Sequence, residues 1–393
     1  MLLVQAVFSL MKILHVTPTY YPATYWGGPI FSVYALNNAL ARKPDVSLKV
    51  LTTDSAGLRV SERLNCAEFD SQLYPNQGVY FARRVAGACV SPGLLWRLPA
   101  LVRWADVVHL TAAYSFTTIP ALVMCRIFNK PLVWSPRGSI QASHEWEGAN
   151  RKGLKRLWEK LCNILIRPGM VVAHTTAERE RVATQERLPD AAAVIVPNGV
   201  DVPDILPARE WLPDGKLRLM YLGRLSPKKG IENLLEALSL LKDKSISLTI
   251  YGAGDIGYTS SLSKLAGQLG LLGESVFFAG HVDGDAKSAV FHSADVCVVP
   301  SYTENFCMVV AEALAHGVPV IASHGTPWAS VEQNQCGLWV GNSPQSLALA
   351  VTKIRTMALS KMGMRGRDWM SREFSWDALA EEMLVIYRSL VSH

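Results

Sequence analysis

Residues 300–323 read PSYTENFCMVVAEALAHGVPVIAS and hold two glutamates, Glu304 and Glu312, with seven residues between them. The pattern predicts the end of one strand, a turn, a short helix and then a second strand. Short apolar strands that alternate with helices are typical of parallel sheets covered on both faces. The stretch therefore predicts a doubly wound α/β fold, and it raises the question of why so apolar a segment keeps two carboxylates.

The same alternation of strands and helices continues along the whole chain of 393 residues, a length that suits two domains of ~150–200 residues. Most candidate strands are continuous apolar runs, as parallel strands buried on both faces require. In the first half of the chain we expect them at 12–17, 47–53, 106–110, 131–135, 170–174 and 193–196. In the second half we expect them at 217–222, 246–251, 275–279, 295–299, 318–322 and 336–340.

The domain boundary is predicted in PNGVDVPDILPAREWLPDGK (197–216), which is rich in Pro, Gly and Asp and shows no periodicity. We place an N-terminal Rossmann-like domain at 11–200, a linker at 201–216 and a C-terminal Rossmann-like domain at 217–373. The remainder, 374–393, is predicted as an amphipathic helix. We interpret residues 1–10, which lack the basic start and the cleavage site of a signal peptide, as a ragged start before Met11.

The composition fits a globular protein, because hydrophobic residues make up 49% and charged residues 18%. No apolar run reaches the ~18 residues that a membrane span needs. The seven cysteines are scattered and form no CxxC pair, which favours a reducing, cytoplasmic compartment and argues against a zinc site. The net charge of +6 fits an anionic substrate or a lipid surface, and it lacks the dense basic stripe of a nucleic-acid binder.

Loops that follow parallel strands are where such sheets bind ligands, and the first two of these loops carry candidate anion-binding groups. Gly27 and Gly28 follow the first strand and precede a helix, whose N-terminus favours an anion. Arg224 and Lys229 flank the turn in YLGRLSPKKG and could bind a diphosphate. A flexible loop and a solvated surface turn are the alternatives.

The third loop, IYGAGDIG, contains a literal GxGxxG at Gly252, Gly254 and Gly257. The helical pattern begins only near Thr259, and the acidic residue expected ~20 residues later is missing, so we do not predict a dinucleotide site. We expect Gly252 and Gly254 to form a close backbone turn beside a ligand. The aspartates of DGD, Asp283 and Asp285, are interpreted as helix caps and not as metal ligands.

The fourth loop is the stretch quoted first. We expect the amides of Phe306, Cys307 and Met308 to form a helix N-terminus suited to phosphate, with Glu312 two turns further on. The two glutamates then lie on neighbouring faces ~12 Å apart along the helix, which suits two parts of one long ligand. A capping glutamate and a satisfied helix carboxylate are the alternative.

In this order the segments GRLSPKKG, YGAGD, AGHV and ADVCVVPSYTENFCMVVAEALAHGVPVIAS resemble glycosyltransferase family 4, from Lys12 to near the end of the chain. The resemblance implies a retaining enzyme of the GT-B fold. In that fold two Rossmann-like domains face a cleft, and the C-terminal helix crosses back to the first domain.

By this resemblance, the donor is a UDP-, GDP- or other nucleoside-diphosphate sugar. Glu304 would meet hydroxyls of the donor sugar, and Glu312 would meet the ribose hydroxyls. Arg224 and Lys229 would grip the diphosphate, helped by the amides that follow Asn305 and by the Gly27-Gly28 loop. The resemblance implies no metal requirement, and a front-side path in which the leaving diphosphate helps to deprotonate the acceptor.

The first half matches the family less closely. Where many members have a histidine after a first-domain strand, this chain reads SPRGS and places Arg137 there. SPRGS and TPWASV (326–331) resemble a bacterial branch that makes exopolysaccharide, O-antigen or capsule. We therefore assign Arg137, Gly138 and His109 to the acceptor side, with a glycan or lipid-linked saccharide lying against 135–150. A purely structural role is the alternative for His109.

Other functions stay open. A sugar-nucleotide epimerase of the same fold would need its own acid and base groups around the cleft, and a transferase could use a small soluble acceptor. A non-catalytic binding protein would not need all four loops together.

RKGLKRLWEKLCNILIRP (151–168) carries apolar residues at helical spacing among six cations. Packing on the first sheet is one interpretation. Peripheral association with the cytoplasmic face of the inner membrane is the other.

Overall fold

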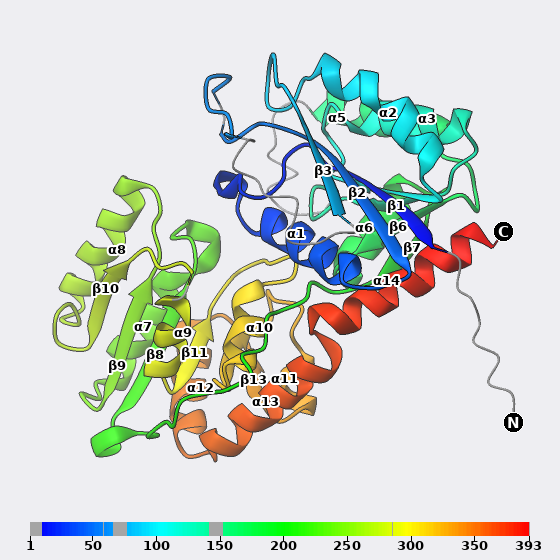
Figure 1. Cartoon of the computed structure of the whole chain (residues 1–393). Helices are drawn as coiled ribbons and strands as arrows, with labels where there is room; N and C mark the ends of the chain where they lie inside the picture. The colour runs from blue at the N-terminus through cyan, green and yellow to red at the C-terminus, as the bar shows by residue number, and fades with distance from the viewer. Residues whose placement is uncertain (1–9, 58, 66–76, 141–151, 285, 393) are drawn as a thin grey trace, which may run out of the picture. The chain divides into compact units, whose positions relative to one another are not determined.

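The computed structural model describes residues 10–57, 59–65, 77–140, 152–284 and 286–392, which form two compact units (Figure 1). The first unit comprises the chain up to Gly199 together with the segment from Trp376 onward. The second unit is Val200–Ser375. Each unit is built around its own parallel sheet.

The first unit has a seven-stranded sheet in the order β3-β2-β1-β4-β5-β6-β7, with every pairing parallel. The order reverses between β1 and β4, as in a doubly wound sheet. The strands are β1 (Met11–Val16), β2 (Val46–Thr53), β3 (Gln77–Ala82), β4 (Val107–Thr111), β5 (Leu132–Ser135), β6 (Val171–Thr175) and β7 (Ala192–Ile195).

Helices cover both faces of this sheet (Figure 1). One face packs against α2 (Pro92–Trp104), α3 (Thr118–Ile127) and α5 (Lys152–Leu165). The other packs against α1 (Gly28–Ala41) and the C-terminal helix α14 (Trp376–Val391). Helix α6 (Glu178–Arg187) joins β6 to β7.

The last helix, α14, lies along α1 (Figure 1). Its inner side packs in the core, and ion pairs hold its edge, among them Arg42–Asp377 at 2.8 Å and Lys43–Glu381 at 2.5 Å. The chain therefore leaves the first unit at Gly199 and returns to it at Trp376. This confirms the expectation that the C-terminal helix crosses back to the first domain.

The second unit has a six-stranded parallel sheet in the order β10-β9-β8-β11-β12-β13, which reverses between β8 and β11. The strands are β8 (Leu217–Leu222), β9 (Ile246–Tyr251), β10 (Val276–Gly280), β11 (Val296–Val299), β12 (Val320–Ser323) and β13 (Gly337–Val340). The helices are α7 (Ile231–Leu241), α8 (Ile256–Gln268), α9 (Ala286–Ser293), α10 (Met308–Ala315), α11 (Ser330–Gln333), α12 (Pro344–Arg355) and α13 (Leu359–Glu373).

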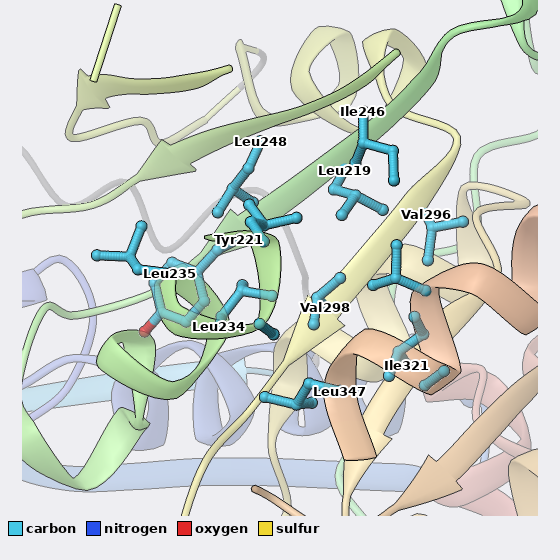
Figure 2. Packing of buried hydrophobic residues seen from close by; sticks show 14 of the residues in the cluster. Leu219, Tyr221, Leu234, Leu235, Ile246, Leu248, Val296, Val298, Ile321 and Leu347 are labelled. Carbon is cyan, nitrogen blue, oxygen red and sulfur yellow. The ribbon is translucent and has the colours of Figure 1, made fainter. Parts of the chain in front are cut away.

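The core on the α7 side of this sheet is a cluster of branched aliphatic side chains around Tyr221 (Figure 2). Leu234 and Leu235 of α7 meet Leu248 and Val298 of the strands. The hydroxyl of Tyr221, the red atom at the edge of the cluster, donates to the carbonyl of Arg224 at 3.0 Å. The core thus fixes the backbone just beyond the end of β8.

All the strands expected from the sequence are present, and the structure adds β3, which the sequence did not predict. In QGVYFA the second residue is glycine and the four middle residues are only partly buried, so no continuous apolar run marks this edge strand.

The segment 201–216, expected as a linker, lies within the second unit. Its Arg209 donates to the carbonyls of Ala294 and Phe291 at 3.0 and 3.1 Å. Residues 1–9, interpreted as a ragged start, lie outside the described residues.

A chain of side-chain hydrogen bonds crosses the first sheet from α14 to the end of β7. His109 links Tyr387 to Ser135 with two contacts of 2.6 Å. Ser135 lies 2.7 Å from His174 Nδ1, and His174 Nε2 lies 2.9 Å from the carbonyl oxygen of Val196. All three side chains of this central part are fully or almost fully buried.

The last acceptor in this series, the carbonyl oxygen of Val196, decides which group donates in each hydrogen bond, because a carbonyl can only accept. Burial lowers the pKa of His174 to about 3 and that of His109 well below its ordinary value, so both rings are neutral. His174 Nε2 therefore donates to Val196, and its Nδ1 accepts from Ser135. Ser135 in turn accepts from His109, whose Nδ1 accepts from Tyr387.

Because these histidines are buried and neutral, we predict that the free energy of unfolding decreases as the pH is lowered through the acidic range. In the unfolded chain their pKa returns to about 6.5, so below that pH the unfolded state binds protons that the folded state does not. Each histidine then lowers the free energy of unfolding by up to about 1.4 kcal/mol per pH unit as the pH falls toward 4. We expect His174→Gln to remove one such contribution between pH 6.5 and 5, measured by urea unfolding. An identical pH dependence in the variant and the wild type would contradict the conclusion that these histidines are neutral in the folded protein.

Candidate functional site

The candidate site of the second unit consists of the loops that follow β8, β9, β11 and β12. The sheet order reverses between β8 and β11, so the connections to α7 and α10 leave in opposite directions, and the strand ends at such a switch point are where open α/β sheets commonly bind ligands. Arg224 and Lys229 lie in the loop after β8, and Glu304 lies in the loop after β11. The topology thus brings together three residues that are up to 80 positions apart in the sequence (304 minus 224).

The loops after β8 and β9 are in direct backbone contact through glycines. A Cβ atom on Gly252 would lie 1.8 Å from the carbonyl oxygen of Gly223, and one on Gly254 would lie 2.1 Å from that of Leu225. The amide of Leu225 donates to the carbonyl of Ala253 at 2.9 Å. Side chains at positions 252 and 254 would therefore push the Arg224 loop away from its neighbour.

The loops after β8, β11 and β12 are joined in the same way. A Cβ atom on Gly230 would lie 2.3 Å from the carbonyl oxygen of Pro300. One on Gly325 would lie 2.3 Å from that of Ser301. The amide of Glu304 donates to the carbonyl of Gly325 at 2.9 Å. The loop that carries Glu304 is therefore fixed on two sides by backbone contacts that only glycine permits.

This packing changes the interpretation of GxGxxG. Gly252 and Gly254 face the backbone of the neighbouring loop, so they support the Arg224 loop and need not face a ligand themselves. Helix α8 begins at Ile256, three residues earlier than expected, and Asp255 caps it by accepting from the amide of Tyr258 at 3.1 Å. The third glycine, Gly257, lies in the first turn of this helix.

Glu304 pairs with Lys229 across these loops. The two side chains are mostly buried, and Lys229 Nζ lies 2.5 Å from Glu304 Oε1. Ser301 donates to the same oxygen at 2.7 Å. The second oxygen, Oε2, makes no hydrogen bond to any residue that the structure describes, so it can still accept from a ligand hydroxyl.

Glu312 has its own lysine, which the sequence did not reveal. Lys287, on α9, lies 2.5 Å from Glu312 Oε1. His316 continues the same helix face. Its Nδ1 lies 2.8 Å from the carbonyl oxygen of Glu312, and its ring stacks on Phe291 with centroids 4.8 Å apart. A lysine that follows a strand-end loop, as Lys287 follows AGHVDGD, is a signal that could have been used.

Arg224 is the cation that remains available at these loops. Its side chain is exposed and makes no hydrogen bond or ion pair with any described residue. A guanidinium can bind two oxygens of a phosphate at once. The structure therefore leaves one uncommitted cation in the loop that also carries Lys229, on a backbone fixed by Tyr221 and by the glycine contacts.

The helix after Glu304 begins later than expected. Helix α10 starts at Met308, and Cys307 is its N-cap, with φ 69° and no side-chain cap. Phe306 is buried and comes before the helix, and its carbonyl accepts from the indole of Trp328 at 2.5 Å. The first-turn amides of α10 therefore have no capping side chain among the described residues, an arrangement suited to an anion.

Glu312 is thus a little over one turn into α10, and the prediction of two turns was wrong. Between Glu304 and Glu312 the chain is helical only from Met308 onward. The rise of ~12 Å expected for a helix over this whole interval therefore does not apply. Asn305, between Glu304 and the cap, is partly buried.

No metal-binding cluster of three or more His, Cys, Asp or Glu side chains occurs in the part of the chain that the structure describes. Asp283 is exposed and lies 3.4 Å from His281, and Asp285 is outside the described residues.

In the first unit, Gly27 precedes α1 with φ 76°, a conformation that favours glycine, and Gly28 is the first residue of the helix. A Cβ atom at either position would meet nothing within 4 Å. The space beside this helix N-terminus is therefore open. The contact of this loop with a diphosphate stays a prediction.

Arg137 and Gly138 follow β5, with φ 53° and 78°. The Gly138 amide donates to Glu180 Oε1 at 2.5 Å, and Arg137 Nη1 donates to Asn198 Oδ1. The Nε and Nη2 atoms of Arg137 are buried and have no hydrogen-bond partner among the described residues. Burial lowers the pKa of this guanidinium, which makes an anionic partner favourable.

The structure does not support His109 as a residue that touches an acceptor. Its side chain has no exposed surface, and both ring nitrogens are used within the hydrogen-bonded chain described above. Residues 141–151, most of the segment expected against the acceptor, lie outside the described residues.

Two family descriptions match the chain, "Glycosyltransferase Family 4" over residues 26–203 and "Glycosyl transferases group 1" over residues 204–367. An uncharacterized glycosyltransferase from Methanocaldococcus jannaschii is 29% identical over 56% of this chain and 59% of its own length. A GDP-mannose-dependent alpha-(1-6)-phosphatidylinositol monomannoside mannosyltransferase from Mycobacterium tuberculosis is 34% identical over 50% of this chain and 55% of its own. The matched part spans less than two thirds of either relative.

Solved structures show the same fold at low sequence identity. Sucrose-phosphate synthase from Thermosynechococcus elongatus superposes with a TM-score of 0.72 and 20% identity, covering 97% of this chain and 99% of that one. HepE from Anabaena, in complex with UDP, gives 0.71 and 16%, covering 96% and 100%. The chain belongs to glycosyltransferase family 4 and has the GT-B fold.

The glycine contacts can be tested with a matched pair of variants. Gly254→Ala should destabilise the protein by ~1–3 kcal/mol, because the new methyl group collides with the Leu225 carbonyl. Gly267→Ala, on the exposed face of α8 with nothing within 4 Å, should instead stabilise it by up to ~1 kcal/mol. Urea unfolding measures both. Equal effects of the two substitutions would show that the loops do not depend on this packing.

Proposed function

We propose that this protein transfers a sugar, with retention of anomeric configuration, from a nucleoside-diphosphate sugar to a glycan or lipid-linked saccharide. The observation that supports this most is the pair of carboxylate–lysine contacts at the switch point of the second sheet, Glu304 with Lys229 and Glu312 with Lys287. An isolated carboxylate pair would suggest acid–base work, whereas carboxylates alternating with cations suit a ligand that alternates hydroxyls and phosphates.

In this proposal Glu304 accepts hydrogen bonds from the transferred sugar through Oε2, and Glu312 accepts from the ribose. Arg224 and Lys229 bind the diphosphate, together with the amides at the start of α10. The charge that develops on the departing diphosphate is met by these groups, which are held in place before the reaction. The departing diphosphate takes the proton of the attacking hydroxyl, and no added metal ion is required.

Two observations support the proposal for the acceptor. Arg137 has buried, unpartnered donors at the end of β5, which suit an anionic group on the acceptor side. One relative is, by its name, a mannosyltransferase that acts on a phosphatidylinositol mannoside. We infer that the acceptor is a lipid-linked saccharide used in the synthesis of bacterial exopolysaccharide, O-antigen or capsule. The protein would then work at the cytoplasmic face of the inner membrane. Among the described residues, no helix combines the length and the apolar character that crossing a bilayer requires.

The proposal is tested by incubating the full chain with a panel of UDP- and GDP-sugars and measuring thermal protection and release of the nucleoside diphosphate. We expect one donor to protect the protein and to be consumed, with activity persisting in excess EDTA. Glu304→Gln should lower kcat by roughly 100-fold or more, because its target is the reacting sugar. Glu312→Gln should raise KM with a smaller loss of kcat.

Three outcomes would contradict the proposal. Isomerisation of the donor without diphosphate release would indicate an epimerase. Complete, metal-reversible loss of activity in EDTA would show that protein cations do not suffice. A larger loss of kcat in Glu312→Gln than in Glu304→Gln would show that the donor lies in the opposite direction.

Lys287 gives a separate test of the Glu312 end. Lys287→Met should weaken binding of the free nucleoside diphosphate by about tenfold, because Glu312 loses the cation that orients it. Lys353→Met, which removes an exposed cation on α12, is the control and should leave binding unchanged. Calorimetric titration measures both. Unchanged affinity in Lys287→Met would remove Lys287 from the donor site.

A further inference from the structure

Helix α5 has two apolar sides, and only one of them packs against the protein. On the inner side Cys162 is fully buried, and Trp158 donates to the carbonyl of Ala113 at 2.9 Å. The interpretation that this segment packs on the first domain is correct for that side. It leaves the other apolar side of the helix unexplained.

The outer side carries four large aliphatic side chains at spacings of three, four and three residues, which place them in one stripe along the helix. Their exposed fractions are 60% for Leu154, 54% for Leu157, 44% for Leu161 and 69% for Ile164. The neighbouring helix α3 adds Ile127, which is 62% exposed. Arg126 ties the two helix ends together by donating to the carbonyl of Ile164 at 3.0 Å.

The exposed charged groups on helices α3 and α5 and just after them are of one sign. Arg156, Lys160 and Arg167 on or just after α5, and Arg126 and Lys130 at the end of α3, carry five positive charges. The acidic residue of α5, Glu159, is buried and pairs with Arg187 at 2.9 Å. Helix α3 contains no acidic residue. We call the four-residue aliphatic stripe, Ile127 and these five cations the basic-apolar surface.

Helix α6, whose Arg187 pairs with Glu159 of α5, carries the exposed Glu178 and Glu186. A shallow pocket lies between the ends of α3 and α5 and is lined by Arg126, Lys130 and Arg167. Its volume of about 10 Å³ is on the order of a single water molecule. The extended surface, and not this pocket, is therefore the feature that needs a partner.

The charge pattern decides between the occupants of such a surface. A second copy of the chain would bring five cations against five, which is unfavourable when they are desolvated together. An anionic bilayer offers negative headgroups to the cations and, directly below them, hydrocarbon to the aliphatic stripe. Amphipathic helices that lie in a membrane interface have this combination of a basic edge and an aliphatic face.

We propose that the basic-apolar surface docks on an anionic phospholipid bilayer, with α5 lying in the interface and its aliphatic stripe inserted among the acyl chains. This goes beyond glycosyl transfer and rests only on contacts within the first unit. It gives a lipid-linked acceptor a location, but it does not require the donor site to be assigned correctly.

The test is co-sedimentation of the full chain with vesicles of pure phosphatidylcholine and with vesicles that also contain phosphatidylglycerol. We expect binding to the anionic vesicles alone, and release when the salt concentration is raised, because salt screens the attraction. The variant Arg156→Gln/Lys160→Gln should lower the partition coefficient by roughly 25-fold, about fivefold per charge. Lys155 is not used, because it lies over the ring of Tyr114.

The control Lys361→Gln/Arg365→Gln removes two exposed cations from α13 and should bind like the wild type.

A second pair of double variants tests whether the aliphatic stripe inserts into the bilayer. Leu157→Gln/Leu161→Gln should lose at least tenfold in binding, whereas Leu240→Gln/Leu349→Gln, two exposed leucines of the second unit, should not. Thermal protection by the donor should be the same in all four variants, so that failure of the donor assignment is recognised separately.

Equal sedimentation with both vesicle types, or with neither, would overturn the proposal. So would unchanged binding in both surface variants. Concentration-dependent dimers that the same substitutions abolish would show that a second copy covers the surface.

Discussion

The proposed donor site depends on backbone-to-backbone packing of the loops at the strand ends of the second sheet. Gly252 and Gly254 let the loop after β9 touch the loop after β8, and Gly230 and Gly325 let the loops after β8 and β12 touch the one after β11. Carbonyl groups fill the space that side chains would need. The loops therefore form one continuous layer, whose spacing is set by peptide groups and not by flexible side chains.

That layer determines what the charged residues can do. Lys229 and Glu304 come from different loops, and they meet at 2.5 Å because the loops beneath them are fixed. Lys287 of α9 meets Glu312 of α10 at the same distance. The apolar segment can keep two glutamates because each has a lysine partner, which offsets the cost of partial burial. Arg224 remains exposed on the same layer and can take a phosphate.

The sequence predicted what depends on local pattern. Buried parallel strands are continuous apolar runs, so twelve of the thirteen strands in the described residues were predicted. Strand β3, with its glycine and partial burial, was not. It could not show pairings between distant segments. Lys287 became a candidate only when α9 was found beside Glu312, and His109 became a structural residue when Tyr387 was found against it. The late start of α10 depends on Cys307, whose positive φ no propensity predicts.

The central claim is that one layer of loops holds both ends of a nucleotide sugar. A crystal structure of the full chain with the donor that protects it from unfolding tests this most directly. The account predicts the diphosphate within hydrogen-bond distance of Arg224 and of the first amides of α10. It also predicts the sugar at Glu304 and the ribose at Glu312. A nucleotide bound elsewhere, or bound with sugar and ribose exchanged between the two glutamates, would contradict the account.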